Sequence, residues 1–458
     1  IHEFVVSEDG LIDGKEIGEI VIKNTPVEIG TKATDKVDGD QIITNTGVET
    51  IVDTVSYKGL IPGKEYVLKG ALHVKSDGKP LEVDGKPVTA EKPFVAESAD
   101  GEVTLEFTFS AKALAGKKLV AFESVWYEGV EVATHADIED KEQTVEVVPV
   151  EIGTLAYDKE DGDKIVPAMP DVVLTDEVGY KYLHKDYEYL VKGVVYSKAT
   201  GKPLVIDGKE VSSELKFKAE NTEGKVYLDF KIDASELAGE DLVIFEELYY
   251  KDELIAEHKD INDEGQTVKV VEVEIGTKAT DKLDGDKTIV ADVEQTIKDT
   301  VSLKYLVPGR EYELAGVIMD KETGEPLLID GKEVTKKLTF TAEKAEQDVV
   351  MEFDINAIDL GGKTVVVFES LYYEGREIAI HAEINDKDQS IDIESPKIGT
   401  QAVNAADGSK VIVANGKVTI LDKVSYEGLV PGREHILSGV QMDKSTGKPL
   451  LVNGKDCL

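Results

Sequence analysis

Cysteine is almost absent from this sequence. The only cysteine among its 458 residues is Cys457, next to the last residue, so no disulfide can close within the chain. This composition suits the cytosol, and it equally suits an extracellular protein that is stabilised by other means. Disulfides are therefore excluded as the source of stability.

Basic residues and long apolar runs are also scarce. The chain has 52 Lys and Arg against 92 Asp and Glu, which gives a formal net charge of −40, and the acidic residues are spread along its whole length. A surface of this sign repels nucleic acid and anionic membranes, so both are excluded as partners. No apolar run approaches the length of about 18 residues that a membrane-spanning helix needs. We expect no membrane insertion in this segment.

The ends of the sequence do not look like natural termini. Ile1 is not a start residue, and no basic and apolar signal segment follows it. We therefore expect the sequence to be part of a longer protein, so a missing signal or anchor indicates little about location.

What the sequence does contain is a repeat with a fixed period of 123 residues. The same polar residues recur at this period: Thr31, Thr154, Thr277 and Thr400; Glu123, Glu246 and Glu369; His135, His258 and His381; Gln143, Gln266 and Gln389. A constant period predicts one module copied in tandem without insertions. The expected domains are residues 1–26 as the end of a preceding β domain, three complete repeats at 27–149, 150–272 and 273–395, and a truncated repeat at 396–458.

Within each repeat, short stretches of alternating apolar and polar residues lie between turn signals such as Asp84-Gly85. This pattern predicts half-buried strands joined by hairpins. The expected fold is all-β, a series of immunoglobulin-like antiparallel β-sandwich domains. One helical turn is expected near residues 110–116 and its counterpart at 234–239. No flexible linker separates the repeats, which predicts an elongated, monomeric rod.

The recurring residues suggest a reaction between the two ends of a repeat. Thr31 has a hydroxyl nucleophile and Gln143 an amide carbonyl, and attack of one on the other would release ammonia and leave an ester. Glu123 and Asp140 are candidates for acid and base, because two nearby carboxyls in a dry site tend to share one proton. His135 would be a polarising or hydrogen-bonding group. Asp140 lies three residues before Gln143, so a bend must bring it to the glutamine.

The repeats resemble the Thr–Gln ester-bond domains, or VaFE repeats, of Gram-positive cell-surface adhesins. The resemblance rests on the segments Val120-Ala-Phe-Glu, Ile244-Phe-Glu and Val367-Phe-Glu and on the His-x-x-x-x-Asp-x-x-Gln ending of each complete repeat. The resemblance implies a self-formed intramolecular ester in each complete repeat and no cofactor or metal. It implies the following sites: Thr31, Glu123, His135, Asp140 and Gln143; Thr154, Glu246, His258, Asp263 and Gln266; Thr277, Glu369, His381, Asp386 and Gln389. Ser390 replaces the threonine that follows glutamine elsewhere. The first residues resemble the end of a transthyretin-like domain, which implies an isopeptide role for Asn24.

Several alternatives compete with this interpretation. Thr34 and Thr280 could be nucleophiles, but the second and fourth repeats have Tyr157 and Val403 at that position. The polar set could also be a buried hydrogen-bond network or a hydrolase-like site.

The acidic segments that begin at Asp35, Asp158 and Asp281 could be calcium loops, although acidic turns are more common. The pairs starting at Trp126, Tyr249 and Tyr372 could be a carbohydrate platform or cross-strand packing. Asp53, Asp176, Asp299 and Asp422 suggest a structural cap.

The expected function is structural rather than enzymatic. The resemblance implies the stalk of a cell-wall-anchored adhesin of a Gram-positive bacterium, extracellular, with a host ligand bound by a tip domain outside this sequence. An ester between the ends of a repeat would protect it from unfolding. The alternatives are that the repeats themselves bind a host protein or glycan, or that they accompany a secreted enzyme.

Overall fold

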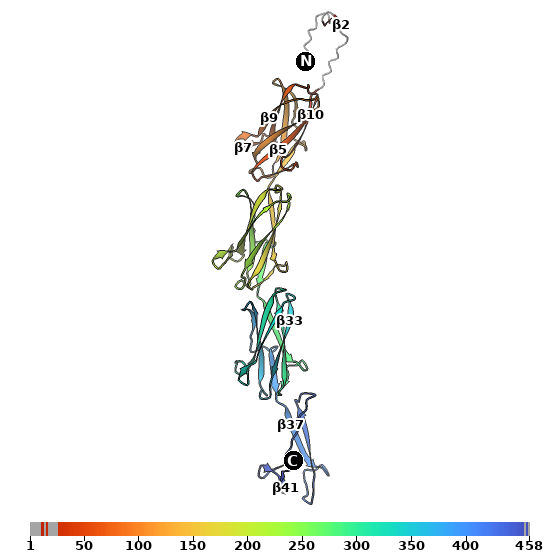
Figure 1. The fold of residues 1–458 in the computed structure, drawn as a ribbon, viewed down its shortest axis with the longest axis vertical. Coiled ribbons are helices and arrows are strands. Elements are labelled where there is room, and N and C mark those ends of the chain that lie inside the picture. The colour runs from red at the N-terminus through yellow and green to blue at the C-terminus, as the bar shows by residue number, and fades with distance from the viewer. Residues whose placement is uncertain (1–10, 13–14, 17–25, 453–454, 457–458) are drawn as a thin grey trace. The chain divides into compact units, whose positions relative to one another are not determined.

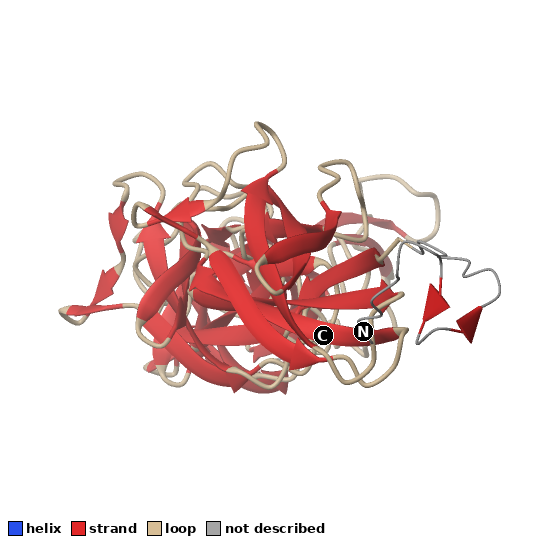
Figure 2. Cartoon of the chain, turned by 90° about the horizontal axis from the view of Figure 1, so that it is seen from above, coloured by secondary structure: helices blue, strands red, loops and turns tan. Residues whose placement is uncertain are grey.

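A computed structural model describes residues 11–12, 15–16, 26–452 and 455–456. Asn24 and Cys457 lie outside the described residues. Within these ranges the chain consists of strands, turns and loops without a helix (Figures 1 and 2). The chain divides into two compact units, one made of residues 1–157, 174–230 and 241–268 and the other of residues 158–173, 231–240 and 269–458. The all-β prediction is confirmed.

The first repeat lies within the first unit. Its strands are β3 (Glu28–Asp35), β4 (Ile42–Thr44), β5 (Val48–Lys58), β6 (Glu65–Val74), β7 (Glu82–Val83), β8 (Lys86–Pro87), β9 (Thr89–Val95), β10 (Gly101–Ser110), β11 (Lys118–Tyr127), β12 (Val130–His135) and β13 (Thr144–Val148).

The second repeat has the same succession with one additional short strand, β18: β14 (Glu151–Asp158), β15 (Ile165–Pro167), β16 (Val172–Lys181), β17 (Glu188–Ser197), β18 (Lys202–Pro203), β19 (Val205–Ile206), β20 (Lys209–Glu210), β21 (Ser212–Lys218), β22 (Gly224–Ile232), β23 (Asp241–Tyr250), β24 (Glu253–His258) and β25 (Thr267–Val271). The third repeat lies within the second unit and contains β26 (Glu274–Asp281), β27 (Thr288–Val290), β28 (Gln295–Lys304), β29 (Glu311–Asp320), β30 (Leu328–Ile329), β31 (Lys332–Glu333), β32 (Thr335–Thr341), β33 (Gln347–Ile355), β34 (Thr364–Tyr373), β35 (Arg376–His381) and β36 (Ser390–Glu394).

The remaining strands flank these repeats: β1 (Leu11–Ile12) and β2 (Lys15–Glu16) before them, and β37 (Lys397–Asn404), β38 (Ile420–Glu427), β39 (Met442–Asp443), β40 (Lys448–Pro449), β41 (Leu451–Val452) and β42 (Lys455–Asp456) after them.

Each complete repeat has a small and a large sheet. In the first repeat the small sheet has the order β10-β5-β3, and the large sheet has the order β4-β13-β11-β6-β9 with β12 also paired to β11. The third repeat has the equivalent orders β26-β28-β33 and β27-β36-β34-β29-β32. The pairings are antiparallel except for β4 with β13 and its counterparts, which are parallel over three residue pairs. That parallel pair was not predicted, because strands of three residues carry little alternation.

Alternation along the strands builds the core. In β5 the buried residues Ile51, Asp53 and Val55 alternate with partly exposed neighbours, and β10 buries Leu105 and Phe107 in the same way. Phe107 packs where Gly70 of β6 has no side chain: a Cβ at Gly70 would lie 2.6 Å from Phe107 Cζ. The Phe107 ring therefore fills the space that a side chain at position 70 would occupy. Gly70 is paired with Glu123 of the neighbouring strand β11.

The helical turn expected at residues 110–116 is wrong. Leu114 N donates to Ala111 O and Lys117 N donates to Leu114 O, which are two successive tight turns with i to i+3 bonds rather than the i to i+4 bonds of an α-helix. The corresponding Leu237 and Glu240 bonds repeat the arrangement. Small residues ending at glycine thus mark a double turn here.

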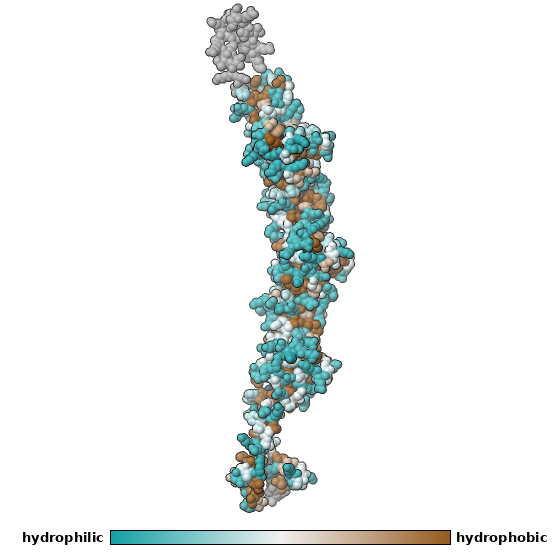
Figure 3. All heavy atoms as spheres, turned by 180° about the vertical axis from the view of Figure 1, so that it is seen from behind, coloured by the Kyte–Doolittle hydropathy of each residue, from teal (hydrophilic) through white to brown (hydrophobic). Residues whose placement is uncertain are grey.

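The visible surface is predominantly hydrophilic, with scattered apolar residues (Figure 3). None of the described residues forms a helix that is long and apolar enough to cross a membrane.

Candidate functional site

Thr31 points from β3 into the space between the sheets. It shares this face with Ala33 and Asp35, which are buried, and it is 9% exposed. Thr34 lies three residues further along, so it faces the other way, and its hydroxyl donates to Val52 O at 3.4 Å. The strand geometry therefore favours Thr31 over Thr34 as the reacting hydroxyl.

Glu123 reaches the same space from the large sheet. It is 2% exposed and lies in β11 directly opposite His135 of β12. Glu246 with His258 and Glu369 with His381 have the same register in the other repeats. The Phe-Glu and His elements of the sequence motif are thus cross-strand neighbours.

Gln143 is the last residue of the turn segment 136–143, directly before β13, and its side chain is fully buried. Gln143 Nε2 donates to Glu123 Oε2 at 2.7 Å. The equivalent bonds measure 2.6 Å from Gln266 to Glu246 and 2.8 Å from Gln389 to Glu369. The glutamine amide nitrogen is therefore held on the glutamate carboxyl in all three complete repeats.

Asp53 is the site residue that the sequence interpretation missed. It is not a structural cap: it lies within β5, is 0% exposed and is opposite Ala33, and its carboxyl lies against that of Glu123. Burial, and then the Asp53 charge, raises the pKa of Glu123, and burial also raises the pKa of Asp53. Two carboxyls in contact hydrogen-bond only when one of them is protonated, so the pair holds one proton at neutral pH.

The other repeats keep this pair. Asp176 and Asp299 are also fully buried. Burial and the neighbouring aspartate raise the pKa of Glu246 and of Glu369 in the same way. A buried carboxyl pair is therefore part of each complete repeat.

Asp140 does not form the predicted pair with Glu123. Its Oδ2 lies 2.9 Å from His135 Nε2, and the carboxyl is partly exposed. Burial raises the pKa of Asp140, but the His135 contact and backbone N–H groups outweigh this effect, so the pKa lies below its usual value. Asp53 thus takes the place expected for Asp140, and Asp140 orients the histidine.

The second ring nitrogen of the histidine differs between repeats. His135 Nδ1 lies 3.3 Å from Ile29 O and His381 Nδ1 lies 3.2 Å from Ile275 O, whereas His258 Nδ1 lies 3.3 Å from Thr154 Oγ1. In the second repeat Asp263, His258 and the Thr154 hydroxyl are therefore connected in a row, because Asp263 Oδ2 lies 3.1 Å from the other ring nitrogen of His258. This order is the one in which an oriented imidazole can accept a hydroxyl proton.

One further side chain holds the glutamine segment in place. Gln41 Nε2 donates to the carbonyls of Lys141 at 2.9 Å, Glu142 at 3.1 Å and Thr144 at 2.9 Å, on both sides of Gln143. In the third repeat the corresponding residue is Lys287.

Lys287 Nζ donates to Ala279 O on the strand that carries Thr277, at 2.6 Å, and also to Asp388 O next to Gln389. Gln41 and Lys287 are thus two different donors that hold the carbonyl of the residue before the glutamine.

Ser390 preserves the hydrogen bond of the threonine that it replaces. Its hydroxyl donates to Asp386 O at 2.6 Å, as the Thr144 hydroxyl does to Asp140 O.

Six buried side-chain oxygens of the first repeat have no partner of hydrogen-bond geometry among the described residues. They are Thr31 Oγ1, Gln143 Oε1, Glu123 Oε1, both carboxyl oxygens of Asp53, and Asn45 Oδ1. A proton shared between Asp53 and Glu123 would pair their carboxyls with each other, which leaves Thr31 Oγ1 and Gln143 Oε1 as the unpaired atoms of the site. Leaving such atoms unpaired costs about 1–3 kcal/mol each. The unpaired hydroxyl faces the Glu123 carboxyl, so the atoms that a Thr–Gln condensation would use are together, dry and unsatisfied.

The acidic segments form turns rather than a recognisable calcium loop. Asp35 Oδ1 accepts from Val37 N at 3.1 Å and Asp40 Oδ1 from Ile42 N at 2.7 Å, so the carboxylates cap their own turn. Among the described residues, Asp281, Asp284 and Asp286 bring their oxygens within 4.8 Å of one another, which is common in exposed acidic turns without an ion.

Comparison with known families gives a direct match. The profile described as "T-Q ester bond containing domain" matches residues 27–147, 150–270, 273–393 and 396–457. The chain belongs to this family. T-Q ester bond domains are structural, cross-linked modules rather than catalytic domains, so the chain is not an enzyme and the resemblance of its motif to ester-bond domains is confirmed.

The chain is also similar to several solved structures, at low identity and low TM-score. A bacterial adhesin from Mobiluncus mulieris containing intramolecular disulfide, isopeptide and ester bond cross-links is 16% identical, with a TM-score of 0.25, covering 57% of this chain and 91% of its own. The C-terminal domain of the Streptococcus agalactiae AgI/II polypeptide BspA is 12% identical, with a TM-score of 0.29 and coverages of 54% and 100%.

The major pilin subunit BcpA of Bacillus cereus is 12% identical, with a TM-score of 0.22 and coverages of 80% and 98%. No curated protein sequence matches the chain.

Proposed function

We propose that each complete repeat closes one ester, between Thr31 and Gln143, Thr154 and Gln266, and Thr277 and Gln389. The observation that carries this proposal is the buried, unpaired state of Thr31 Oγ1 and Gln143 Oε1 on either side of Glu123. A hydrogen-bond network that served only packing would satisfy these atoms. Thr400 of the fourth repeat is exposed on β37, and the proposal covers only the three complete repeats.

In the proposed reaction, Thr31 Oγ1 attacks Gln143 Cδ and gives up its proton to a neighbouring base. The base is the Asp53–Glu123 pair, which is in contact with the hydroxyl, assisted by the histidine that Asp140 orients. The carbon–nitrogen bond then breaks, and the amide nitrogen takes a proton from Glu123, on which it already rests. The products are one ester and one ammonia. No external oxidant, reductant or nucleotide is consumed.

The charge pattern explains why one buried pair can perform both proton transfers. A carboxyl pair that holds a single proton at neutral pH contains a base and an acid at the same time. Its surroundings are dry, so neither form is stabilised by bulk water. The same proton can therefore travel from the hydroxyl to the leaving nitrogen through this pair.

We further propose that the repeats form the stalk of a cell-surface adhesin on a Gram-positive bacterium. Thr31 and Gln143 lie 112 residues apart, near the two ends of the repeat, so their ester would carry a pulling force past the strands between them. The single cysteine fits this role, since an ester needs no oxidising compartment. Attachment to the cell wall and a ligand-binding tip belong to this proposal.

The decisive experiment is the intact mass of the denatured protein. Each closed repeat lowers the mass by one ammonia, about 17 Da, so three losses are expected. Replacing Gln143→Ala should remove one loss and leave the other two, and Thr34→Val is a control that retains the reacting pair, because Thr34 lies on the opposite face of β3. A mass equal to that of the unmodified sequence would overturn the proposed cross-link.

A further inference from the structure

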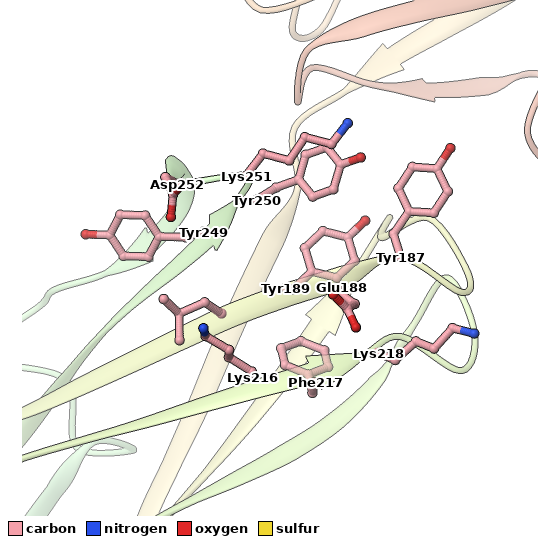
Figure 4. Close-up of a pocket in the computed structure, with 11 residues that line it drawn as sticks. Tyr187, Glu188, Tyr189, Lys216, Phe217, Lys218, Tyr249, Tyr250, Lys251 and Asp252 are labelled. Carbon is pink, nitrogen blue, oxygen red and sulfur yellow. The ribbon is translucent and has the colours of Figure 1, made fainter.

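The second repeat has a hollow at the ends of β17, β21 and β23 that the cross-linking chemistry does not use. Its volume is about 620 Å³. Five rings line it, as Figure 4 shows: Tyr187, Tyr189, Phe217, Tyr249 and Tyr250. All residues of the hollow lie in the first compact unit.

Four of the rings form one continuous surface. Tyr187 and Tyr250 are stacked with centroids 5.8 Å apart, Tyr250 and Tyr189 are 5.3 Å apart, and Tyr189 and Phe217 are 5.9 Å apart. Tyr189 is buried and its hydroxyl accepts from His184 N, so it belongs to the framework. Tyr187 is 36% exposed and offers its ring and hydroxyl to solvent.

Three lysines surround these rings. Lys251 Nζ lies 4.7 Å from the centroid of the Tyr250 ring, and Lys218 pairs with the exposed Asp186 at 2.9 Å. Lys216 lines the hollow next to Leu190 and makes no ion pair within the part of the chain that the structure describes. The three lysines are matched by the three carboxylates of Asp186, Glu188 and Asp252, so in a chain of net charge −40 this hollow is less acidic than the chain as a whole.

The other repeats show which of these residues belong to the shared framework. Positions 123 residues away keep the buried rings, with Tyr66, Phe94 and Tyr127 in the first repeat and Tyr312, Phe340 and Tyr373 in the third. They do not keep the residues around the opening. Lys251 corresponds to Glu128 and Glu374, Tyr187 to Lys64 and Arg310, and Lys216 and Lys218 to Pro93 and Val95 or Thr339 and Thr341. The fold therefore forms without these lysines and without Tyr187.

We propose that this hollow binds an anionic saccharide, a sugar chain that carries carboxylate or sulfate groups. The open tyrosine rings offer flat apolar faces for the C–H faces of a sugar, and their hydroxyls can hydrogen-bond to sugar hydroxyls. Lys216, Lys218 and Lys251 then pair with the acidic groups. This binding function goes beyond the structural role of the repeats and does not depend on the ester.

The test is a calorimetric titration of the whole chain with a hyaluronan hexasaccharide, which carries carboxylates only, and with a heparin-derived hexasaccharide, which also carries sulfates. Binding of the hyaluronan hexasaccharide would show that carboxylate groups are sufficient. Tighter binding of the heparin-derived hexasaccharide would show that sulfate is the preferred group. Neutral chitohexaose is the control for binding through the aromatic rings alone. Hexaglutamate is the control for binding through negative charge alone. Binding should weaken as salt is added.

Two substitutions borrow residues from the other repeats and so preserve the fold. Lys251→Glu and Tyr187→Lys should each weaken saccharide binding about tenfold or more, because each removes a direct contact. Lys209→Glu, in the β20 hairpin outside the hollow, makes the same charge change as Lys251→Glu and should leave binding unchanged.

The proposal is overturned if neither acidic saccharide binds, if hexaglutamate binds as tightly as they do, or if Lys209→Glu and Lys251→Glu have equal effects. Intact mass measured on the same samples reports the esters separately, so failure of one proposal is distinguishable from failure of the other.

Discussion

Replacing Thr31 by valine separates the ester from every other contribution to stability. Valine has nearly the shape of threonine, and Thr31 Oγ1 has no partner of strict hydrogen-bond geometry, although it lies against the Glu123 carboxyl. The substitution therefore removes the nucleophile and this one contact. Thr34→Val is the matched control, since it changes the same side chain on the opposite face of β3 and removes only a 3.4 Å bond to Val52 O.

The expected loss follows from the length of the closed loop. An ester between residues 31 and 143 closes a loop of 112 residues in the unfolded chain. The chain-entropy relation used for disulfides then gives about 4.8 kcal/mol at room temperature. With a guanidinium dependence of about 4 kcal/mol per molar for a domain of this size, the unfolding midpoint should fall by about 1.2 M.

The sequence provides a convenient probe for this measurement. Trp126 is the only tryptophan of the chain and lies in β11 of the first repeat, so its fluorescence reports the unfolding of that repeat. Guanidinium titration of the whole chain should show a lower Trp126 midpoint for Thr31→Val, and intact mass should show two ammonia losses. Thr34→Val should keep three losses and a midpoint within about 0.3 M of the parent, since one weak hydrogen bond contributes about 1 kcal/mol.

Two results would refute the reasoning. If Thr31→Val still loses three ammonia molecules, Thr31 is not the nucleophile. If it loses two but the Trp126 midpoint does not move, the ester forms without constraining the unfolded chain, and the stability of the repeat comes from packing alone.

Three further predictions concern the same repeat. Asp53→Asn should reduce the ammonia losses from three to two, because Glu123 loses the carboxyl with which it shares a proton; three losses at the parental rate would contradict this role. In a Thr31→Val background, burial and Asp53 raise the pKa of Glu123 in the folded state, so stability should fall as pH rises above the ordinary glutamate value of 4.5. The Trp126 midpoint should show this loss, and adding Glu123→Gln should flatten it; equal slopes would argue against a buried proton. Gln41→Met removes the donor that holds the carbonyls around the glutamine, so a time course by mass should show slower closure of the first repeat, whereas unchanged kinetics would limit Gln41 to packing.

The sequence predicts the fold well because a copied module shows its own pattern several times. Alternation in segments such as Val103–Phe109 and the Asp-Gly turns predict strands, hairpins and two sheets. The short strand β4 was not predictable, since three residues contain too few alternations, and the double turn at Ala111–Lys117 has the composition of a short helix. Local composition alone does not decide between these two forms.

The sequence predicted the threonine, glutamate, histidine and glutamine side chains that the fold brings together, but not the contact between Asp53 and Glu123. Asp140 was expected to share a proton with Glu123, with a bend that brings it to Gln143, but its carboxyl lies against His135 instead. Asp53 carried a readable signal, because it lies between Ile51 and Val55 at the inward positions of an alternating strand. An acidic residue at an apolar position of such a pattern predicts a buried carboxyl.

The five groups of a site come from the beginning, middle and end of the repeat: Thr31 from β3, Asp53 from β5, Glu123 from β11, His135 from β12 and Gln143 from the turn directly before β13. Both sheets must therefore be assembled, and the space between them dry, before any of these side chains can react. Under the proposed reaction, only a repeat that has folded correctly can close its ester. A newly made chain would stay linear until then, and the ester would be a covalent mark of a correctly folded repeat.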